Sequence, residues 1–102
     1  MSLSKQTLKS KPVTKVTFTV PSEHCNGAKA VAVVGEFNGW DADATPLKKQ
    51  KDGSFKGTVE LTTGKEYQFR YLIDGEVWIN ETEADKFVAS GISMEENSVV
   101  VL

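Results

Sequence analysis

Two tryptophans stand out among the side chains able to take part in binding, because each follows a turn signal. Trp40 comes directly after Asn38-Gly39, and Trp78 follows Asp74-Gly75. Asn-Gly and Asp-Gly pairs favour tight turns because these residue types tolerate positive φ. An indole beside such a turn, on a short and rigid backbone, is expected near the surface. The pair suggests a flat apolar platform that stacks on a partner, which requires no catalytic group.

Arg70 adds a polar group to this platform. It lies in the cleanest alternating segment, Lys65 to Ile73, on the face without the aromatic residues, and Asp74-Gly75 brings Trp78 back alongside. Sugars suit this mixture, because their C–H faces stack on aromatic rings while their hydroxyls take hydrogen-bond donors and acceptors. A structural alternative stays open, in which Trp40 packs at the rim of the fold and Trp78 belongs to the core.

A catalytic role finds little support in the sequence. The single histidine, His24, stands next to the single cysteine, Cys25, but neighbours on an extended chain point in opposite directions and do not converge as a dyad requires. Carboxylates for glycosidic cleavage are disfavoured as well. The acids fall on turns and on loops predicted to be exposed, where nothing raises a pKa into the general-acid range. The sequence predicts a protein that is not an enzyme.

Metal binding is the other chemistry that the acidic residues suggest. Asp41 with Asp43, and Glu81 with Glu83 and Asp85, resemble calcium ligands in type. Their spacing is not that of an EF-hand, and charge-rich loops are usually only solvated. No glycine-rich loop for phosphate is present. We therefore predict no metal and no cofactor.

The elements that must position these residues read as short strands. Val16, Phe18 and Val20 alternate with polar residues, and the apolar run 30–34 is typical of a central strand. No segment keeps an apolar period of 3.6 residues. About seven strands, with turn signals roughly every 8–12 residues, predict an all-β fold: a single immunoglobulin-like antiparallel β-sandwich.

Composition narrows the class of partner. The net charge of −2 argues against nucleic acid as the partner, and no apolar run approaches the roughly 20 residues of a membrane span. A single cysteine favours a reducing compartment, so with Met1 as the natural start we expect a cytoplasmic protein. Residues 1–12 are predicted to be a flexible basic lead-in, and residues 13–102 the domain.

The motifs, taken in order, resemble carbohydrate-binding module family 48. The residues that carry this resemblance are Val33 to Trp40, Tyr67 to Gly75, Trp78, and Asn97 to Val100. The family includes the early-set domains of isoamylases, pullulanases and glycogen-branching enzymes. It also includes the glycogen-binding domain of the AMP-activated protein kinase beta subunit. The similarity spans about residues 13–102, and the chain departs from many members just after Trp78.

The resemblance implies a non-catalytic module that binds α-1,4-glucan such as glycogen, starch or maltodextrin. It implies that Trp40 and Trp78 stack on glucose rings. Arg70 stands where kinase-type members have a lysine that hydrogen-bonds sugar hydroxyls, and Asn97 matches an asparagine that contacts hydroxyls from the other side. An alternative function is a protein-interaction or regulatory scaffold domain. Such a domain would dock in trans on a glycoside hydrolase or a kinase-type enzyme.

Overall fold

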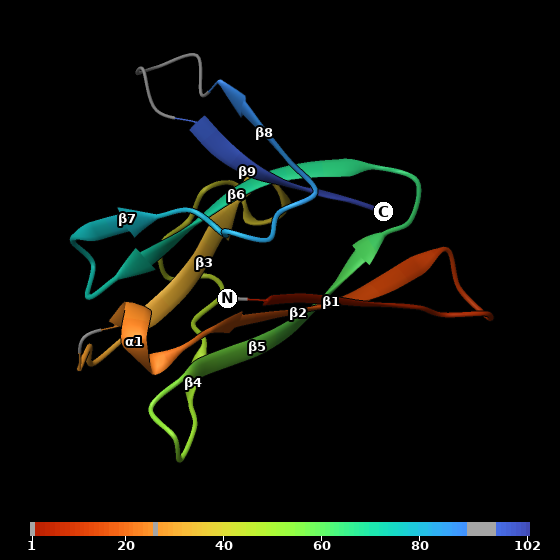
Figure 1. The fold of residues 1–102 in the computed structure, drawn as a ribbon. Helices are drawn as coiled ribbons and strands as arrows, with labels where there is room; N and C mark the ends of the chain where they lie inside the picture. The colour runs from red at the N-terminus through yellow and green to blue at the C-terminus, as the bar shows by residue number, and fades with distance from the viewer. Residues whose placement is uncertain (1, 26, 90–95) are drawn as a thin grey trace.

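The computed structural model describes residues 2–25, 27–89 and 96–102, which form two antiparallel sheets (Figure 1). The first sheet has the strand order β1-β2-β5-β4. These strands are β1 (Ser2–Thr7), β2 (Val13–Val20), β5 (Phe55–Thr62) and β4 (Lys48–Lys49). The long pairing of β2 with β5 forms the centre of this layer.

The second sheet has the order β3-β6-β9-β8, and β7 also pairs with β6. Its strands are β3 (Val31–Gly35), β6 (Glu66–Ile73), β9 (Glu96–Val101), β8 (Lys86–Ala89) and β7 (Val77–Ile79). One edge of β6 pairs with β3, while its other edge is shared by β9 and β7. β6 is therefore the strand through which the rest of this sheet is connected.

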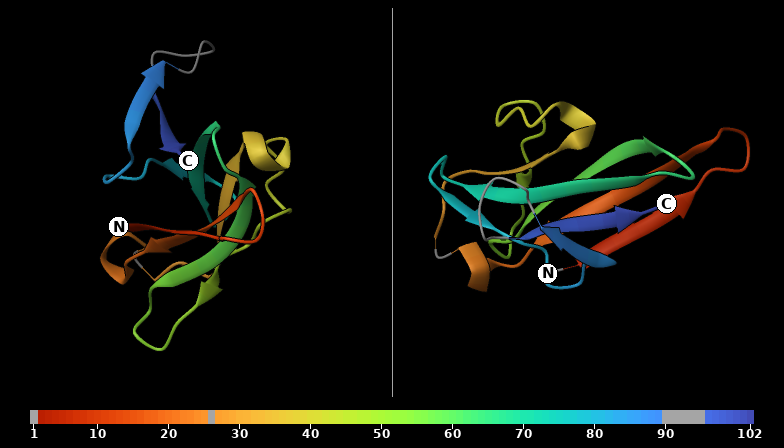
Figure 2. Two further views of the ribbon diagram at one scale, coloured as in Figure 1. Left: turned by 90° about the vertical axis from the view of Figure 1, so that its right-hand side faces the viewer. Right: turned by 90° about the horizontal axis from the view of Figure 1, so that it is seen from above.

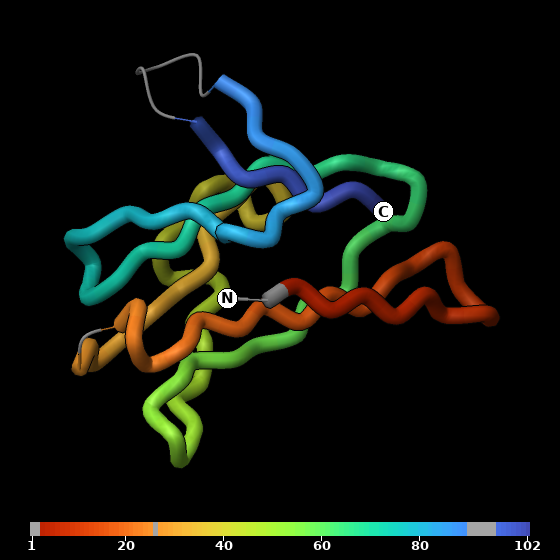
Figure 3. Tube along the Cα trace, in the orientation of Figure 1, coloured from red at the N-terminus to blue at the C-terminus, as the bar shows by residue number. Residues whose placement is uncertain are grey.

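The two sheets lie over one another as layers (Figure 2). The chain passes from the first sheet to the second between β2 and β3, returns at β4, and crosses again between β5 and β6 (Figure 3). Two short helical segments lie in these connections, α1 (Ser22–Cys25) and η1 (Glu36–Asn38). Both helical segments of the described chain are too short to span a bilayer.

The core lies between the two sheets and is rich in aromatic rings. Phe18 of β2 meets Phe69 of β6 edge to face, with ring centroids 5.1 Å apart, and it also contacts Tyr71 and Phe37. Alternate residues of β2, β3, β5 and β6 supply most of this interior, as the two-residue period of a strand requires. The prediction of an antiparallel β-sandwich is confirmed, with nine strands described in place of about seven.

The beginning of the chain differs from the lead-in expected over residues 1–12. Ser2–Thr7 form β1, which pairs with β2 from Ser2↔Thr19 to Thr7↔Thr14. Leu3 packs against the core, and Lys5 Nζ lies 2.6 Å from Asp85 Oδ2. A polar, lysine-containing segment suits an edge strand, where charged side chains are common. The contacts that hold it are its pairing with β2 and the Lys5–Asp85 contact, and composition alone did not reveal either.

Candidate functional site

The outer face of the second sheet gathers most of the residues singled out in the sequence. Along β6, Phe69, Tyr71 and Ile73 belong to the core. Gln68, Arg70 and Leu72 therefore point to the other face, because successive side chains of a strand alternate. Cross-strand partners share a face, and the partners on this side are Val34 opposite Arg70, Trp78 opposite Leu72, and Val99 opposite Gln68.

Trp78 is presented by a hairpin whose three connecting residues, Asp74 to Glu76, join β6 to β7. Asp74 and Gly75 have φ of 51° and 69°, and the Glu76 N–H donates to the Ile73 carbonyl at 3.0 Å. This geometry is the primed turn that Asp-Gly favours. Trp78 is 46% exposed. The alternative in which Trp78 belongs to the core is wrong, because Ile79, its neighbour, is the residue of β7 that packs against the core.

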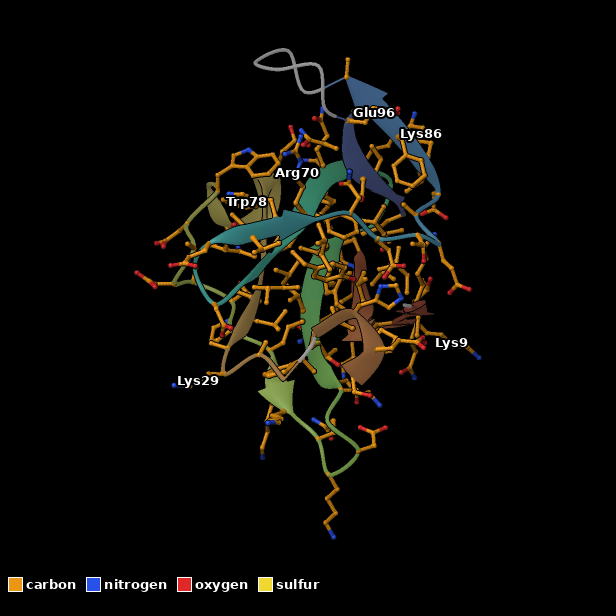
Figure 4. All side chains as sticks on the ribbon, turned by 60° about the vertical axis from the view of Figure 1, so that its left-hand side comes forward. Lys9, Lys29, Arg70, Trp78, Lys86 and Glu96 are labelled. Carbon is orange, nitrogen blue, oxygen red and sulfur yellow. The ribbon has the colours of Figure 1, made fainter. Side chains whose placement is uncertain are left out.

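Arg70 and Trp78 are diagonal neighbours on this face, since Trp78 lies opposite Leu72, two residues beyond Arg70 (Figure 4). Arg70 is half-buried. Beneath them lies a small apolar cluster of Ala32, Val34 and Leu72, separate from the main core. Val34 is completely buried although it points away from the main core. The side chains on this face therefore close over an apolar floor while Trp78 stays open to solvent.

Trp40 lies in the loop that follows β3, and it is 41% exposed. The turn is shifted by one residue from the predicted Asn38-Gly39 pair. Gly39 and Trp40 are the residues with positive φ, at 67° and 61°, whereas Asn38 ends η1. A bulky residue rarely adopts positive φ, and such strain persists only where surrounding contacts enforce it. The alternative that buries Trp40 under the following loop is wrong, because much of its surface is open.

The Asn38 side chain supplies those contacts. Its Oδ1 accepts the Gly35 N–H at 3.0 Å, and its Nδ2 donates to the Val33 carbonyl at 3.0 Å and to Thr45 Oγ1 at 3.1 Å. The Trp40 N–H donates to the Gly35 carbonyl at 2.9 Å. Asparagine is therefore needed here as a local crosslink, rather than as a residue that tolerates positive φ.

The same loop is also attached directly to β6. Glu36 Oε1 accepts the backbone N–H of Gln68 at 2.7 Å, at the point where β3 ends and can no longer pair with β6. Gly35 approaches β6 so closely that a Cβ there would lie 2.5 Å from the Gln68 carbonyl oxygen. The loop that carries Trp40 and the strand that carries Arg70 are thus held to each other.

Asn97 differs from the other three predicted residues. It lies on β9 opposite Val88 and is only 6% exposed. Its Nδ2 donates to Gln68 Oε1 at 2.9 Å. Gln68 was not among the residues predicted from the sequence to form the site. The signal was present, since Gln68 shares the non-aromatic face of the alternating segment with Arg70, but its bond to Asn97 depends on strand pairing.

Glu81 is a second surprise, because the acids were expected on exposed loops. It is completely buried. Its Oε1 accepts from the Tyr71 hydroxyl at 2.8 Å, and its Oε2 accepts the Glu83 N–H at 2.9 Å. Desolvation, followed by the nearby Glu81 charge, raises the pKa of Tyr71, so this hydroxyl stays a donor. The carboxylate is a hydrogen-bonded part of the interior and does not face the outer surface.

The remaining candidates for chemistry are dispersed. Cys25 is buried, its Sγ donates to the Pro21 carbonyl at 3.3 Å, and desolvation raises the pKa of its thiol. The imidazole of its neighbour His24 is near Glu23 and not paired with the thiol: His24 Nε2 lies 3.9 Å from Glu23 Oε1. Over residues 2–25, 27–89 and 96–102, no group of three or more metal-ligating side chains occurs. The outer face of the second sheet instead brings the exposed indole of Trp78 together with the polar side chains of Gln68, Arg70 and Asn97.

Comparison with known proteins identifies one family. A family model described as the glycogen recognition site of AMP-activated protein kinase matches residues 18–98. This range contains Trp40, Arg70, Trp78 and Asn97, together with most of both sheets. β1 and the first part of β2 lie outside it. A search of the curated proteins finds no match to the chain.

Proposed function

The chain belongs to the family of the glycogen recognition site of AMP-activated protein kinase, a carbohydrate-binding module, and from this premise we propose which residues bind the sugar. Trp40 and Trp78 stack on glucose units of an α-1,4-glucan. Arg70 donates to its hydroxyls, and Asn97 contributes from the neighbouring strand β9. The module holds the glucan and does not cleave it.

One observation supports this proposal above the others: both indoles are exposed, at 41% and 46%, on segments tied to β6. A tryptophan with only a structural role would stabilise the fold more if its ring were buried. Exposed rings beside a guanidinium supply the two kinds of contact that a sugar makes. The strained backbone of Trp40 points the same way, because strain of this kind gathers at ligand sites.

The expected affinity is modest. Stacking on an aromatic side chain contributes about 1–3 kcal/mol per ring, by analogy with nucleobases. A neutral hydrogen bond adds about 1 kcal/mol net. Two rings and a few hydrogen bonds then correspond to a Kd in the micromolar to millimolar range. Such a site works on a polymer, where many equivalent sugar units are offered to it.

The proposal is tested by titrating the protein with maltoheptaose while following indole fluorescence. We expect a saturable change, and a loss of about tenfold in affinity for Trp40→Ala or Trp78→Ala, the equivalent of one stacked ring. Phe87→Ala is the matched control. Phe87 is 43% exposed but lies opposite Ser98, on the other side of the sheet from Asn97. Absence of a saturable change in the wild type would refute the assignment. So would tryptophan variants that both bind maltoheptaose as tightly as the wild type does.

We also propose that the module acts on glucan through an enzyme partner, a glycoside hydrolase or a kinase-type protein, which it brings to the polymer. A module that only binds glucan can change the rate of glucan breakdown or synthesis only through a catalytic domain that it brings to the polymer. Capture from native lysate should recover such an enzyme even with excess maltodextrin, which removes proteins bridged by glucan alone. Recovery of no enzyme under these conditions would count against this partner.

The cytoplasm remains our proposal for its location. Support comes from the single cysteine, which is buried and forms no disulfide within the chain. Fractionation of cells producing the native protein should place it with cytosolic markers, and recovery from the secreted fraction would contradict this.

A further inference from the structure

Gln68 is the residue at which the parts of the candidate site meet. Its backbone N–H donates to Glu36 of the Trp40 loop at 2.7 Å, and its side-chain Oε1 accepts from Asn97 of β9 at 2.9 Å. It stands two residues before Arg70 on β6, on the same outer face. Three separate segments of the sequence are therefore joined through one side chain and its peptide group.

The bond to Asn97 decides how the Gln68 amide is oriented. A carboxamide has an acceptor oxygen on one side and a donor NH2 group on the other. Because Asn97 occupies the oxygen, Nε2 must point the opposite way within the amide plane. No hydrogen bond within residues 2–25, 27–89 and 96–102 involves Gln68 Nε2. Gln68 is half-buried, and its Nε2 is not among the fully buried side-chain nitrogen and oxygen atoms that lack a partner in the described residues.

Asn97 and Gln68 thus differ in what they offer a ligand. Asn97 is 6% exposed and its NH2 group is already bound to Gln68. A sugar hydroxyl that approached the Asn97 NH2 group directly would compete with this part-buried hydrogen bond to Gln68. An approach to Gln68 Nε2 breaks no hydrogen bond among the described residues. Direct contact is therefore less costly at Gln68.

We propose that Gln68 is a further glucan-contacting residue, and that Asn97 is a positioning residue which holds the Gln68 amide with its NH2 group toward the sugar. This inference rests on the proposed glucan-binding function. Gln68 Nε2 donates to an oxygen of a glucose unit, beside the donors of Arg70. The polar edge of the site then consists of donors, so it selects sugar positions whose oxygens are free to accept.

A double-mutant cycle separates the two roles. We expect Gln68→Ala to weaken maltoheptaose binding about fivefold, the loss of one neutral hydrogen bond. Asn97→Ala should weaken it by no more than this, and the double variant should bind like Gln68→Ala, because Asn97 acts through Gln68. Additive losses would mean that Asn97 contacts the sugar itself, and would overturn its positioning role.

Gln68→Glu tests the donor without removing the side chain. The carboxylate still accepts from Asn97 but has no N–H to give, so glucan binding should fall at least as far as in Gln68→Ala. The urea midpoint should stay near that of the wild type, because the bond to Asn97 is kept; a purely structural role would not predict weaker binding at unchanged stability. Gln6→Ala is the matched control, since Gln6 is an exposed glutamine on β1 of the other sheet.

A measurement on the wild type covers the case in which these variants fail to fold. In nitrogen-15 spectra, the side-chain NH2 signals of Gln68 should shift on addition of maltoheptaose, while those of Gln50 on the β4–β5 turn stay in place. Binding without any shift of the Gln68 signals would overturn the inference and leave the glucan function standing. If the wild type binds no glucan at all, the proposed function fails, and this inference fails with it.

Discussion

The role of some residues in this protein could not be predicted from the residue type, and Glu81 is the clearest case. A buried carboxylate is stable only when its oxygens are hydrogen-bonded. Here Tyr71 supplies one donor and the Glu83 N–H the other. The Glu81 N–H donates in turn to Ser98 Oγ at 2.9 Å, which links the segment after β7 to β9. A residue that looks like part of an acidic loop therefore belongs to the interior.

We predict that Tyr71→Phe destabilises the fold by removing one donor from this buried carboxylate. The free energy of unfolding should fall by about 1–3 kcal/mol, the usual cost of an unsatisfied buried polar group. Urea unfolding of the wild type and variant provides the measurement. Tyr67→Phe serves as the control, because the Tyr67 hydroxyl makes no hydrogen bond among the described residues. Equal stability of all three proteins would contradict this role for Glu81.

At the scale of elements, the segment from Gly35 to Thr45 shows how a loop gains the rigidity of a strand. Backbone hydrogen bonds such as Trp40 N–H to the Gly35 carbonyl fold it back on itself, and the side chain of Asn38 adds three more. Because Glu36 and Gly35 also fasten it to β6, Trp40 is held in a strained conformation before any ligand arrives. Preorganisation of this kind lowers the entropy that binding would otherwise cost.

Replacement of Asn38 should therefore weaken glucan binding although we do not expect Asn38 to touch the sugar. Asn38→Ala removes three hydrogen bonds and should lower the free energy of unfolding by about 1–3 kcal/mol. Binding of maltoheptaose should weaken as Trp40 loses its fixed position. Asn38→Asp keeps the acceptor for the Gly35 N–H but loses both donors, so an intermediate effect is expected. Unchanged affinity in a folded Asn38→Ala protein would disprove the preorganisation of Trp40.

On the scale of the whole molecule, the two sheets are joined at their edges as well as through the core. Lys5 of β1 donates to Asp85 Oδ2 at 2.6 Å, and the same oxygen accepts the Val101 N–H at 2.7 Å. Burial acts to raise the pKa of Asp85, but the Lys5 and Val101 hydrogen bonds and the Lys5 charge together lower it below its ordinary value of 3.8. The net direction shows that the folded state favours the ionised carboxylate.

This direction fixes the sign of a pH dependence. A group whose pKa is lowered by folding stabilises the protein above its ordinary pKa, and the contribution is lost as the pH falls through the folded value. Stability should therefore decline as the pH falls below about 4. Asp85→Asn should flatten this acid decline, as measured by unfolding midpoints between about pH 2 and pH 6.

The control for this effect is Asp43→Asn, since Asp43 is exposed and its side chain makes no hydrogen bond among the described residues. It should leave the acid decline as steep as in the wild type. An equally steep decline in Asp85→Asn would show that the Lys5–Asp85 pair does not link stability to pH.

Local patterns in the sequence predicted the fold class and part of the candidate site. The alternation of Tyr67, Phe69, Tyr71 and Ile73 predicted β6 and placed Arg70 on the opposite face, because side-chain direction in a strand depends only on position along the chain. The Asp74-Gly75 pair predicted the β6–β7 hairpin, because its turn type follows from the φ angles these two residues tolerate.

Only the tertiary structure decided the rest, because it depends on pairing between distant segments. The burial of Glu81 follows from the position of Tyr71. β1 is held by its pairing with β2 and by the Lys5–Asp85 pair. The hydrogen bond between Gln68 and Asn97 follows from the register of β9 on β6. The sequence gives the residue types and, through the alternation of each strand, the face on which each side chain lies. Which of them meet is settled when the sheets pair and pack, since a shift of register by one residue would move every side chain to the other face.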